Sequence, residues 1–119
     1  MRTIIAGSRT ITDPQILLDA LKKIDWEISQ VVCGMARGAD ELGYRWAKAN
    51  NIPIAEFPAD WRRYRKSAGS RRNAEMARNA DALLALWDGK SRGTNHMIYV
   101  AAQNGLRVKI YNPFDKEES

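Results

Sequence analysis

Residues 3–10, TIIAGSRT, decide the fold, because an apolar run typical of a buried strand ends in a glycine-bearing loop that carries an arginine. The same pattern occurs twice more. Gly34–Asp40 (GMARGAD) follows the apolar run Val31–Cys33, and Gly89–Thr94 (GKSRGT) follows Leu83–Trp87. In an open parallel sheet such loops gather at one edge, where strand ends and helix N-termini form an anion site. Three such loops, each with an arginine, predict a ligand that bears phosphate.

The composition is that of a small globular domain. The chain has 119 residues, 45% of them apolar and 28% charged, which predicts a single domain over residues 1–119 with a short acidic tail from about residue 113. Its one cysteine, Cys33, has no intramolecular disulfide partner, and no apolar run approaches the roughly 18 residues needed to cross a membrane. With no secretory pattern at the N-terminus, these features favour the cytoplasm.

Positive charge is unevenly distributed along the chain. The net charge is +5, and the segment from Arg62 to Arg78 contains a single acid, Glu75. Its basic residues are Arg62, Arg63, Arg65, Lys66, Arg71, Arg72 and Arg78. Such a block is typical of a solvated helix face or of a surface that attracts polyanions.

Apolar periodicity alternates between strand and helix along the whole chain. Strands are expected at about residues 2–6, 30–33, 53–57, 82–87 and 107–111. Helices are expected at about residues 14–24, 40–49, 71–79 and 94–103, and the irregular stretch 59–70 has room for a short helix. Asp13 and Pro14 form a cap and first-turn pair before the first helix, and Asn104-Gly105 is a stop signal after the last.

This alternation predicts an α/β fold with an open parallel sheet of about five strands and helices on both faces. Right-handed crossovers leave few strand orders. The Rossmann-like order 3-2-1-4-5 is favoured, because it places Gly7-Ser8-Arg9 beside Gly89–Thr94 at the point where the order reverses. The flavodoxin-like order 2-1-3-4-5 is the alternative.

The motifs resemble those of a known superfamily. The runs GSRT, GMARGAD, FPADW, AGSRRNAEMARNAD and WDGKSRGT, in this order, resemble the SLOG superfamily of Rossmann-like nucleotide-sensing proteins, which includes DprA and the LOG phosphoribohydrolases. The similarity is greatest to the small YspA/YpsA-like branch and covers roughly Thr3 to Val108. It implies a nucleotide ligand and a homo-oligomer in which neighbouring subunits complete each other's sites.

The LOG enzymes carry an arginine-and-methionine helix and a later loop with a catalytic glutamate. Arg72, Met76 and Asp81 match the first of these motifs, and Gly93-Thr94 matches part of the second. The glutamate position is Met97, and a thioether cannot transfer protons as a carboxylate does. The resemblance therefore leaves the catalytic residues unassigned, with Arg72, Glu75 and His96 as weak candidates. One histidine and one distant cysteine predict no metal site.

The candidate ligand-binding residues are glycines that let a backbone approach a phosphate, together with hydroxyl, guanidinium and carboxylate groups and one aromatic ring. They are Gly7, Ser8, Arg9, Gly34, Arg37, Gly38, Asp40, Asp60, Trp61, Arg71, Arg72, Asn73, Gly89, Ser91, Gly93 and Thr94. The loop Asp88–Thr94 lacks the spacing of a P-loop or of a GxGxxG fingerprint, so it is interpreted only as a phosphate-cradling loop that opens a helix.

Several of these candidates have a structural alternative. Asp40 is expected to cap the helix that follows, to hold a ribose hydroxyl or to orient Arg37. Trp61 is expected either to stack on a base, with Asp60 contacting a base edge or hydroxyl, or to anchor the long connection by packing. Arg71–Asn73 are expected to begin a helix whose N-terminus faces the strand ends.

Three functions are compatible with these patterns. The first is binding of a nucleotide or nucleotide derivative by a sensor or sequestering protein. Its phosphates are expected on Gly7–Arg9, Arg72 and Gly93-Thr94, and its base near Trp61 or Trp87. The second is hydrolysis of an N-glycosidic or phosphate bond in such a ligand, as the LOG resemblance implies.

The third function is single-stranded nucleic-acid binding, as the DprA resemblance implies. It would use the block Arg62–Arg78, with Trp61 and Tyr64 stacking on bases. This reading ranks last, because the chain has no dedicated nucleic-acid motif. No membrane contact is expected, and no cofactor beyond the nucleotide.

Overall fold

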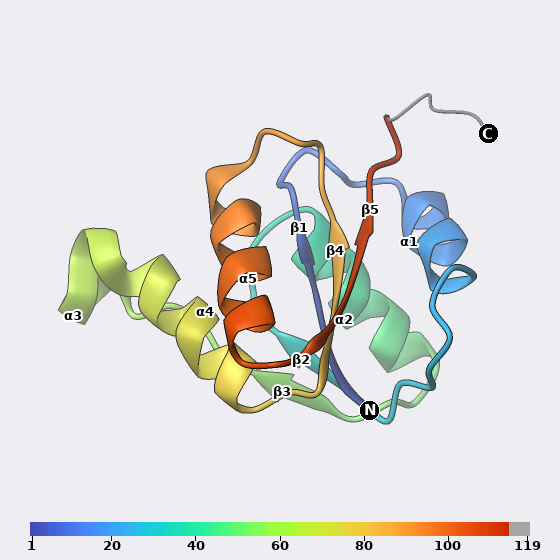
Figure 1. Cartoon of the computed structure of the whole chain (residues 1–119), viewed down its shortest axis with the longest axis horizontal. Coiled ribbons are helices and arrows are strands. Elements are labelled where there is room, and N and C mark those ends of the chain that lie inside the picture. The colour runs from blue at the N-terminus through green and yellow to red at the C-terminus, as the bar shows by residue number, and fades with distance from the viewer. Residues whose placement is uncertain (115–119) are drawn as a thin grey trace.

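A computed structural model describes residues 1–114, which form one sheet covered by helices on both faces (Figure 1). The strands are β1 (Arg2–Gly7), β2 (Gln30–Cys33), β3 (Ile54–Glu56), β4 (Ala82–Leu86) and β5 (Arg107–Tyr111). The helices are α1 (Pro14–Leu21), α2 (Ala39–Ala49), α3 (Trp61–Tyr64), α4 (Ala68–Arg78) and α5 (Arg92–Gln103), with a 3₁₀ turn η1 (Arg65–Ser67). The charged part of the expected acidic tail, residues 115–119, lies outside the described residues.

The sheet has the order β3-β2-β1-β4-β5, and every neighbouring pair is parallel. The Rossmann-like order is thus confirmed, and the flavodoxin-like alternative is wrong. The chain builds outward from β1 to β3 and then crosses back to β4 on the other side of β1. Gly7 pairs with Leu86, so β1 and β4 end side by side at one edge of the sheet.

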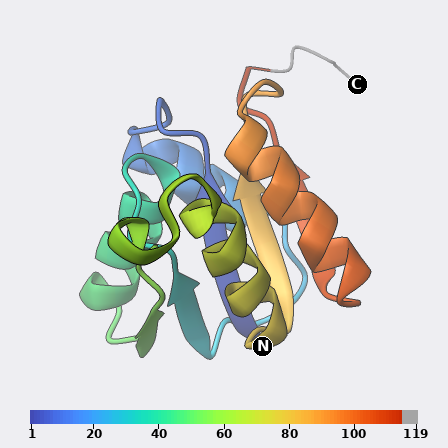
Figure 2. The same ribbon diagram turned by 90° about the vertical axis from the view of Figure 1, so that its left-hand side faces the viewer.

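Two layers of apolar side chains hold the helices on the sheet. Ile5 and Leu84 belong to the layer under α1 and α2, whereas Ile4 and Leu83 belong to the layer under α4 and α5. Figure 2 views the molecule from the α4–α5 side. Because both faces are covered, β4 is buried at every position, which explains its unbroken apolar sequence ALLAL.

The first helix ends earlier than its periodicity predicts. Asp13 caps it, accepting a hydrogen bond from the Gln15 amide at 3.0 Å, but α1 stops at Leu21 instead of Ile24. The next two amides, at positions 22 and 23, bond to carbonyls three residues back, which tightens and closes the last turn. Ile24 still packs against the core from outside the helix, and this contact accounts for the longer apolar pattern.

Three other helices begin before their expected first residues, at Ala39, Ala68 and Arg92. The largest difference is in α4, because η1 runs directly into it and the Ala68 amide donates to the Arg65 carbonyl. The expectation that Arg71–Asn73 begin a helix is therefore wrong, since these residues lie about one turn inside α4.

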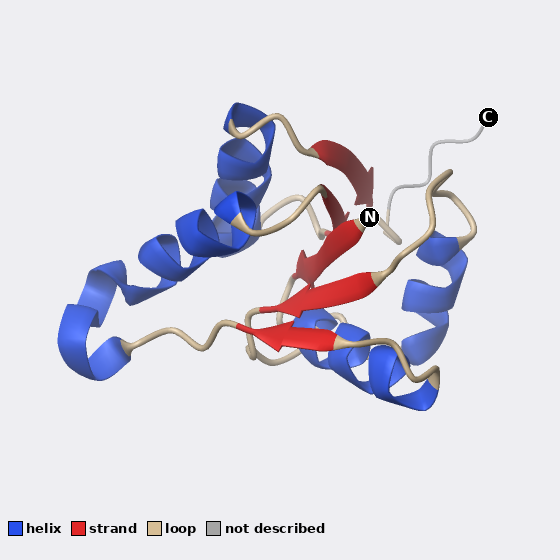
Figure 3. Ribbon diagram, turned by 90° about the horizontal axis from the view of Figure 1, so that it is seen from below, coloured by secondary structure: helices blue, strands red, loops and turns tan. Residues whose placement is uncertain are grey.

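The stretch after β3 contains the short helix for which the sequence left room. α3 and η1 project away from the sheet (Figure 3), and neither contains a buried residue. They join the body of the domain through α4, whose Met76 and Ala77 are in the core.

Candidate functional site

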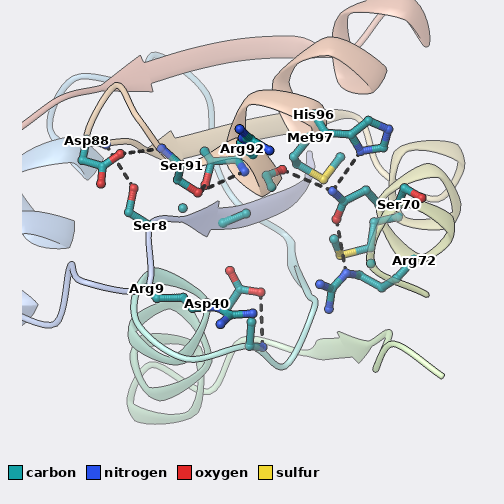
Figure 4. A pocket seen from close by; sticks show the side chains of 18 of the residues that line it. Ser8, Arg9, Asp40, Ser70, Arg72, Asp88, Ser91, Arg92, His96 and Met97 are labelled. Atoms are coloured by element: carbon teal, nitrogen blue, oxygen red, sulfur yellow. Dashed lines mark hydrogen bonds between the residues drawn. The ribbon is translucent and has the colours of Figure 1, made fainter. Parts of the chain in front are cut away.

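A cavity of about 570 Å³ opens at the edge of the sheet where β1 and β4 end (Figure 4). Its wall comes from the end of β1, the loop after β2, the first turn of α2, α3, the first part of α4 and the β4–α5 loop with the start of α5. The cavity lies where the strand order reverses, which is the usual ligand position in open α/β sheets.

The structure brings together many of the residues that the motifs indicate. The predicted ligand-binding residues in the cavity wall are Gly7, Ser8, Arg9, Asp40, Trp61, Arg72, Asn73, Ser91, Gly93 and Thr94. Those outside the wall are Gly34, Arg37, Gly38, Asp60, Arg71 and Gly89. Of the weak catalytic candidates, Arg72 and His96 line the cavity and Glu75 does not.

Other wall residues were not among the predicted ones. They are Ala6, Thr10, Ala36, Gly69, Ser70, Met76, Asp88, Arg92 and Met97. Asp88 and Arg92 belong to the same loop as the predicted Ser91, and Ser70 belongs to the run that contains Arg72, so the motifs marked the segments but not every residue in them. Met97, at the LOG glutamate position, is buried in this wall.

The end of β1 is locked to β4. The Ser8 amide donates to the Leu86 carbonyl at 2.9 Å, and the Ser8 hydroxyl accepts from the Asp88 amide at 3.1 Å. A Cβ at Gly7 would overlap the Leu86 carbonyl oxygen and lie 2.8 Å from the Cβ of Ala39. Only glycine lets the strand end pass this close to its neighbours.

The β4–α5 loop is shaped by one carboxylate. Asp88 Oδ1 accepts from the amides of Lys90 at 2.8 Å and Ser91 at 2.9 Å. These amide bonds hold the pKa of Asp88 below its usual range. The loop is thereby held in a fixed shape, with an ionised Asp88 at the rim of the cavity.

The N-terminus of α5 faces the cavity, and no acidic side chain in its first turn offsets the positive end of the helix dipole. Ser91 is the N-cap, its hydroxyl accepting from the Thr94 amide at 3.4 Å, so the helix begins two residues before the expected Thr94. The first turn contains no acid and begins with Arg92. Within residues 1–114, the Arg92 and Gly93 amides make no hydrogen bond. Amide donors, the helix dipole and a guanidinium are the groups with which helix N-termini attract anions.

Arg72 and Asn73 connect three walls of the cavity. Arg72 donates from Nη1 to the Gly34 carbonyl after β2 and from Nε to Asn73 Oδ1 at 3.2 Å. Asn73, which is buried, donates from Nδ2 to the Gly93 carbonyl at 3.3 Å in α5. Arg72 is therefore a brace between α4 and the β2 loop, in addition to being a cation in the cavity wall.

The same amide of Asn73 contacts the one histidine of the chain. Asn73 Nδ2 lies 3.2 Å from His96 Nδ1, within hydrogen-bonding distance. The His96 ring is thus oriented at the cavity wall by a residue of α4 (Figure 4).

Asp40 is a buried acid on the cavity wall, with 5% of its surface exposed. It does not cap α2, because Gly38 occupies the N-cap position and the carboxylate instead accepts from the Ala36 amide at 3.4 Å. Burial raises the pKa of Asp40 to about 6, although Arg72 acts in the opposite direction.

The expected orientation of Arg37 by Asp40 is wrong as well. Arg37 is exposed and outside the cavity wall, and Arg72 is the cation that acts on Asp40. A Cβ at Gly34 would lie 2.8 Å from Asp40 Oδ2 and 2.9 Å from Arg72 Nη1. Gly34 therefore serves the site by leaving room for these two side chains.

Of the two tryptophans expected near a base, Trp61 lines the cavity and Trp87 does not. Trp61 lines the cavity and is 54% exposed, with its ring over Gly69 of α4. Asp60 caps α3 by accepting from the Arg63 amide at 3.1 Å. Trp87 is outside the cavity wall, and its indole N–H donates to the Ser91 carbonyl at 3.1 Å.

The described part of the chain has neither a cluster of metal ligands nor a membrane-spanning helix. Residues 1–114 contain no group of three or more histidine, cysteine, aspartate or glutamate side chains placed to hold a metal ion. None of the helices in this range has the length and apolarity needed to cross a membrane.

The fold and the position of the cavity define a Rossmann-like α/β domain with a cavity at its switch point. A family model described as the YspA, cpYpsA-related SLOG family matches residues 1–64. The chain is also 38% identical to the gene 61 protein of Mycobacterium phage D29, in an alignment that covers 90% of this chain and 93% of that protein. The chain belongs to the YspA/cpYpsA-related SLOG family, and this membership implies a nucleotide-sensing domain.

Proposed function

We propose that the protein binds a nucleotide or nucleotide derivative in this cavity, as a sensor or sequestering protein, with a phosphate group at the first turn of α5. The observation that carries the proposal is the composition of that turn. Helices favour acids in the first turn by about 0.3–1 kcal/mol each, and α2 has Asp40 and Glu41 there. α5 has Arg92 instead, together with unbonded amides. A bound anion would turn this unfavourable end into a favourable one.

The rest of the wall supports the same ligand. Ser8 and Arg9 lie at the neighbouring strand end and offer further donors to the phosphate. Arg72 Nη2 makes no hydrogen bond within the described residues, so this nitrogen is available although the other two are engaged. Asp40 supplies an acceptor for ribose hydroxyls, and the Trp61 ring an exposed face for the base.

The test exploits Gly93, because a Cβ added there meets no atom within 4 Å. Gly93→Asp places a carboxylate in the anion site while favouring the helix, and Gly93→Ala is the matched neutral control. We expect titration calorimetry with 5′-AMP and ADP to show at least about a tenfold weaker affinity for Gly93→Asp and little change for Gly93→Ala. Absence of affinity in the wild type, with no nucleotide in the mass spectrum of its denatured extract, would overturn the proposal.

Hydrolysis of the ligand is the second candidate, and one observation favours it. Asp40 is a cavity carboxyl with a pKa of about 6, so it can exchange a proton near neutral pH and could replace the absent glutamate. Chromatography of nucleotide recovered from the wild type and from Asp40→Asn separates the two candidates. Products formed by the wild type alone would support hydrolysis, whereas unaltered nucleotide would leave binding as the function.

A further inference from the structure

The whole net charge of the protein is on one projecting segment. We define the basic arm as residues 61–71, which comprise α3, η1 and the first residues of α4. It contains five of the 19 lysines and arginines and none of the 14 acids, so the rest of the chain has 14 of each. Figures 1 and 3 show this arm extending away from the sheet. The charges of the rest of the chain sum to zero, and the arm carries +5.

The cations of the arm are exposed and lack carboxylate partners. They are Arg62, Arg63, Arg65, Lys66 and Arg71. The ion pairs found among residues 1–114 join Arg2 to Asp81, Arg45 to Glu41 and Arg107 to Asp25, and none involves the arm. Like charges this close repel one another, so the arm contributes unfavourable electrostatic energy unless an anion binds there.

The ring of Tyr64 is already in contact with two guanidinium groups of the arm. The Arg71 guanidinium lies 4.3 Å from its ring centroid and that of Arg63 lies 5.1 Å away. Arg71 also donates to the Ser67 hydroxyl at 3.0 Å. The sequence-based expectation that Tyr64 stacks on a base is therefore disfavoured, because guanidinium groups already lie close to its ring. Trp61, by contrast, keeps more than half of its surface exposed.

The arm and the cavity form one continuous surface. Trp61, Gly69 and Ser70 belong to the arm and also line the cavity. A chain of phosphates that leaves the cavity on this side meets the cations of the arm next, without crossing an acidic patch of the arm itself. The five cations of the arm all lie outside the cavity wall, beyond a ligand confined to the cavity.

We propose that the basic arm binds the backbone of a single-stranded nucleic acid whose terminal nucleotide occupies the cavity with its base stacked on Trp61. This inference rests on the proposed function, because it requires the cavity to accept a nucleotide. A single strand fits better than a duplex, since the base that stacks on Trp61 must be unpaired. Base stacking combined with a cationic track is the usual chemistry of single-strand recognition.

The experiment compares matched pairs of charge deletions. Arg62→Ala/Lys66→Ala removes two arm cations whose side chains make no hydrogen bond, ion pair or cation–π contact within the described residues and lie outside the cavity wall. Lys22→Ala/Lys23→Ala is the control, because these exposed lysines follow α1 on the other side of the sheet. Calorimetry with a 5′-phosphorylated oligodeoxythymidylate of about 12 nucleotides measures affinity at two salt concentrations.

We expect the arm variant to bind the oligonucleotide about tenfold more weakly than the wild type and to lose about 1.4 from the slope of log affinity against log salt. The control should match the wild type, Trp61→Ala should weaken binding about tenfold, and 5′-AMP should compete with the oligonucleotide. Equal loss in the arm variant and the control would overturn the inference. So would equal affinity for a duplex, for polyglutamate or for anionic vesicles.

Binding of 5′-AMP keeps the two proposals distinguishable. Arg62→Ala/Lys66→Ala should retain the wild-type affinity for 5′-AMP, whereas Gly93→Asp should lose affinity for both 5′-AMP and the oligonucleotide. Normal 5′-AMP binding without oligonucleotide binding would overturn the arm inference alone. Absence of both would overturn the proposed function as well.

Discussion

The two edges of the sheet use similar charged residues in opposite ways. At the edge where the strands begin, Asp81 accepts from the Arg2 amide and, through both carboxylate oxygens, from its guanidinium at 2.8–3.1 Å. At the edge where they end, Arg9 and Arg92 make no ion pair within residues 1–114, and Asp40 is buried without one. Charges at the first edge are satisfied by each other. Those at the second remain available to a ligand.

This contrast follows from the direction of a parallel sheet. Helices begin at the edge where strands end, so unbonded amides gather there and not at the opposite edge. Asp81, which matches the LOG motif by spacing, lies at the first edge and outside the cavity wall. Its match in sequence therefore reflects the stability of the sheet and not the ligand site.

The largest expected effect is a loss of stability caused by a substitution at the edge where the strands end. Gly7→Ala would drive a Cβ into the Leu86 carbonyl and Ala39, so we expect it to lower the free energy of unfolding by about 3 kcal/mol. Gly93→Ala, at the same edge but with open space around the added atom, should change it by less than about 1 kcal/mol. Urea unfolding followed by tryptophan fluorescence measures both. Equal effects would contradict the close packing of β1 against β4.

An intermediate effect concerns the buried acid. Because the folded state raises the pKa of Asp40 to about 6, above its unfolded value of about 3.9, the native state binds the proton more tightly and is stabilised as the pH falls. Between about pH 7.5 and about pH 4.5 this group should add roughly 2 kcal/mol to the free energy of unfolding. Asp40→Asn should lack this contribution. Parallel pH profiles for the two proteins would show that Asp40 titrates normally.

The smallest expected effect belongs to the opposite edge. Arg2 holds the pKa of Asp81 at about 2, so the pair contributes stability above about pH 4 that is lost as the pH falls towards 2. Both side chains are more than a third exposed, so Asp81→Ala should cost only about 1 kcal/mol at neutral pH. It should leave 5′-AMP affinity unchanged, and a loss of binding would contradict the separation of the two edges. Thermal unfolding and calorimetry provide the two measurements.

The loops show how far local sequence can locate a site. Glycines that follow apolar runs correctly indicated the edge of the sheet at which the cavity opens. The four glycines compared below nevertheless have different structural roles. Gly38 and Gly89 have φ of +75° and +83°, so they shape turns outside the cavity wall. Gly7 permits a close approach, and Gly34 leaves room for two side chains. The sequence has the same letter in all four places, because the backbone angles and neighbours are not local properties.

Arg71 and Arg72 show the same limit within a helix. Both were expected at a helix start, but α4 begins three residues earlier and successive side chains on a helix point about 100° apart. Arg72 therefore reaches the Gly34 carbonyl while Arg71 covers Tyr64 on the arm. The position of η1, which no periodicity indicated, decides which of the two enters the cavity wall.

By itself the sequence determined the alternation of strands and helices, favoured the observed order of the sheet and indicated the edge at which the cavity opens. These properties follow from apolar periodicity and from glycine positions, which act over a few residues. Only the tertiary structure decided which side chains line the cavity, why Asp40 holds its proton to a higher pH and how the basic arm meets the cavity. Each of these depends on atoms from β2, α4 and α5, which are far apart in the chain. Burial and electrostatic interactions depend on distance in the folded structure and not on separation along the sequence.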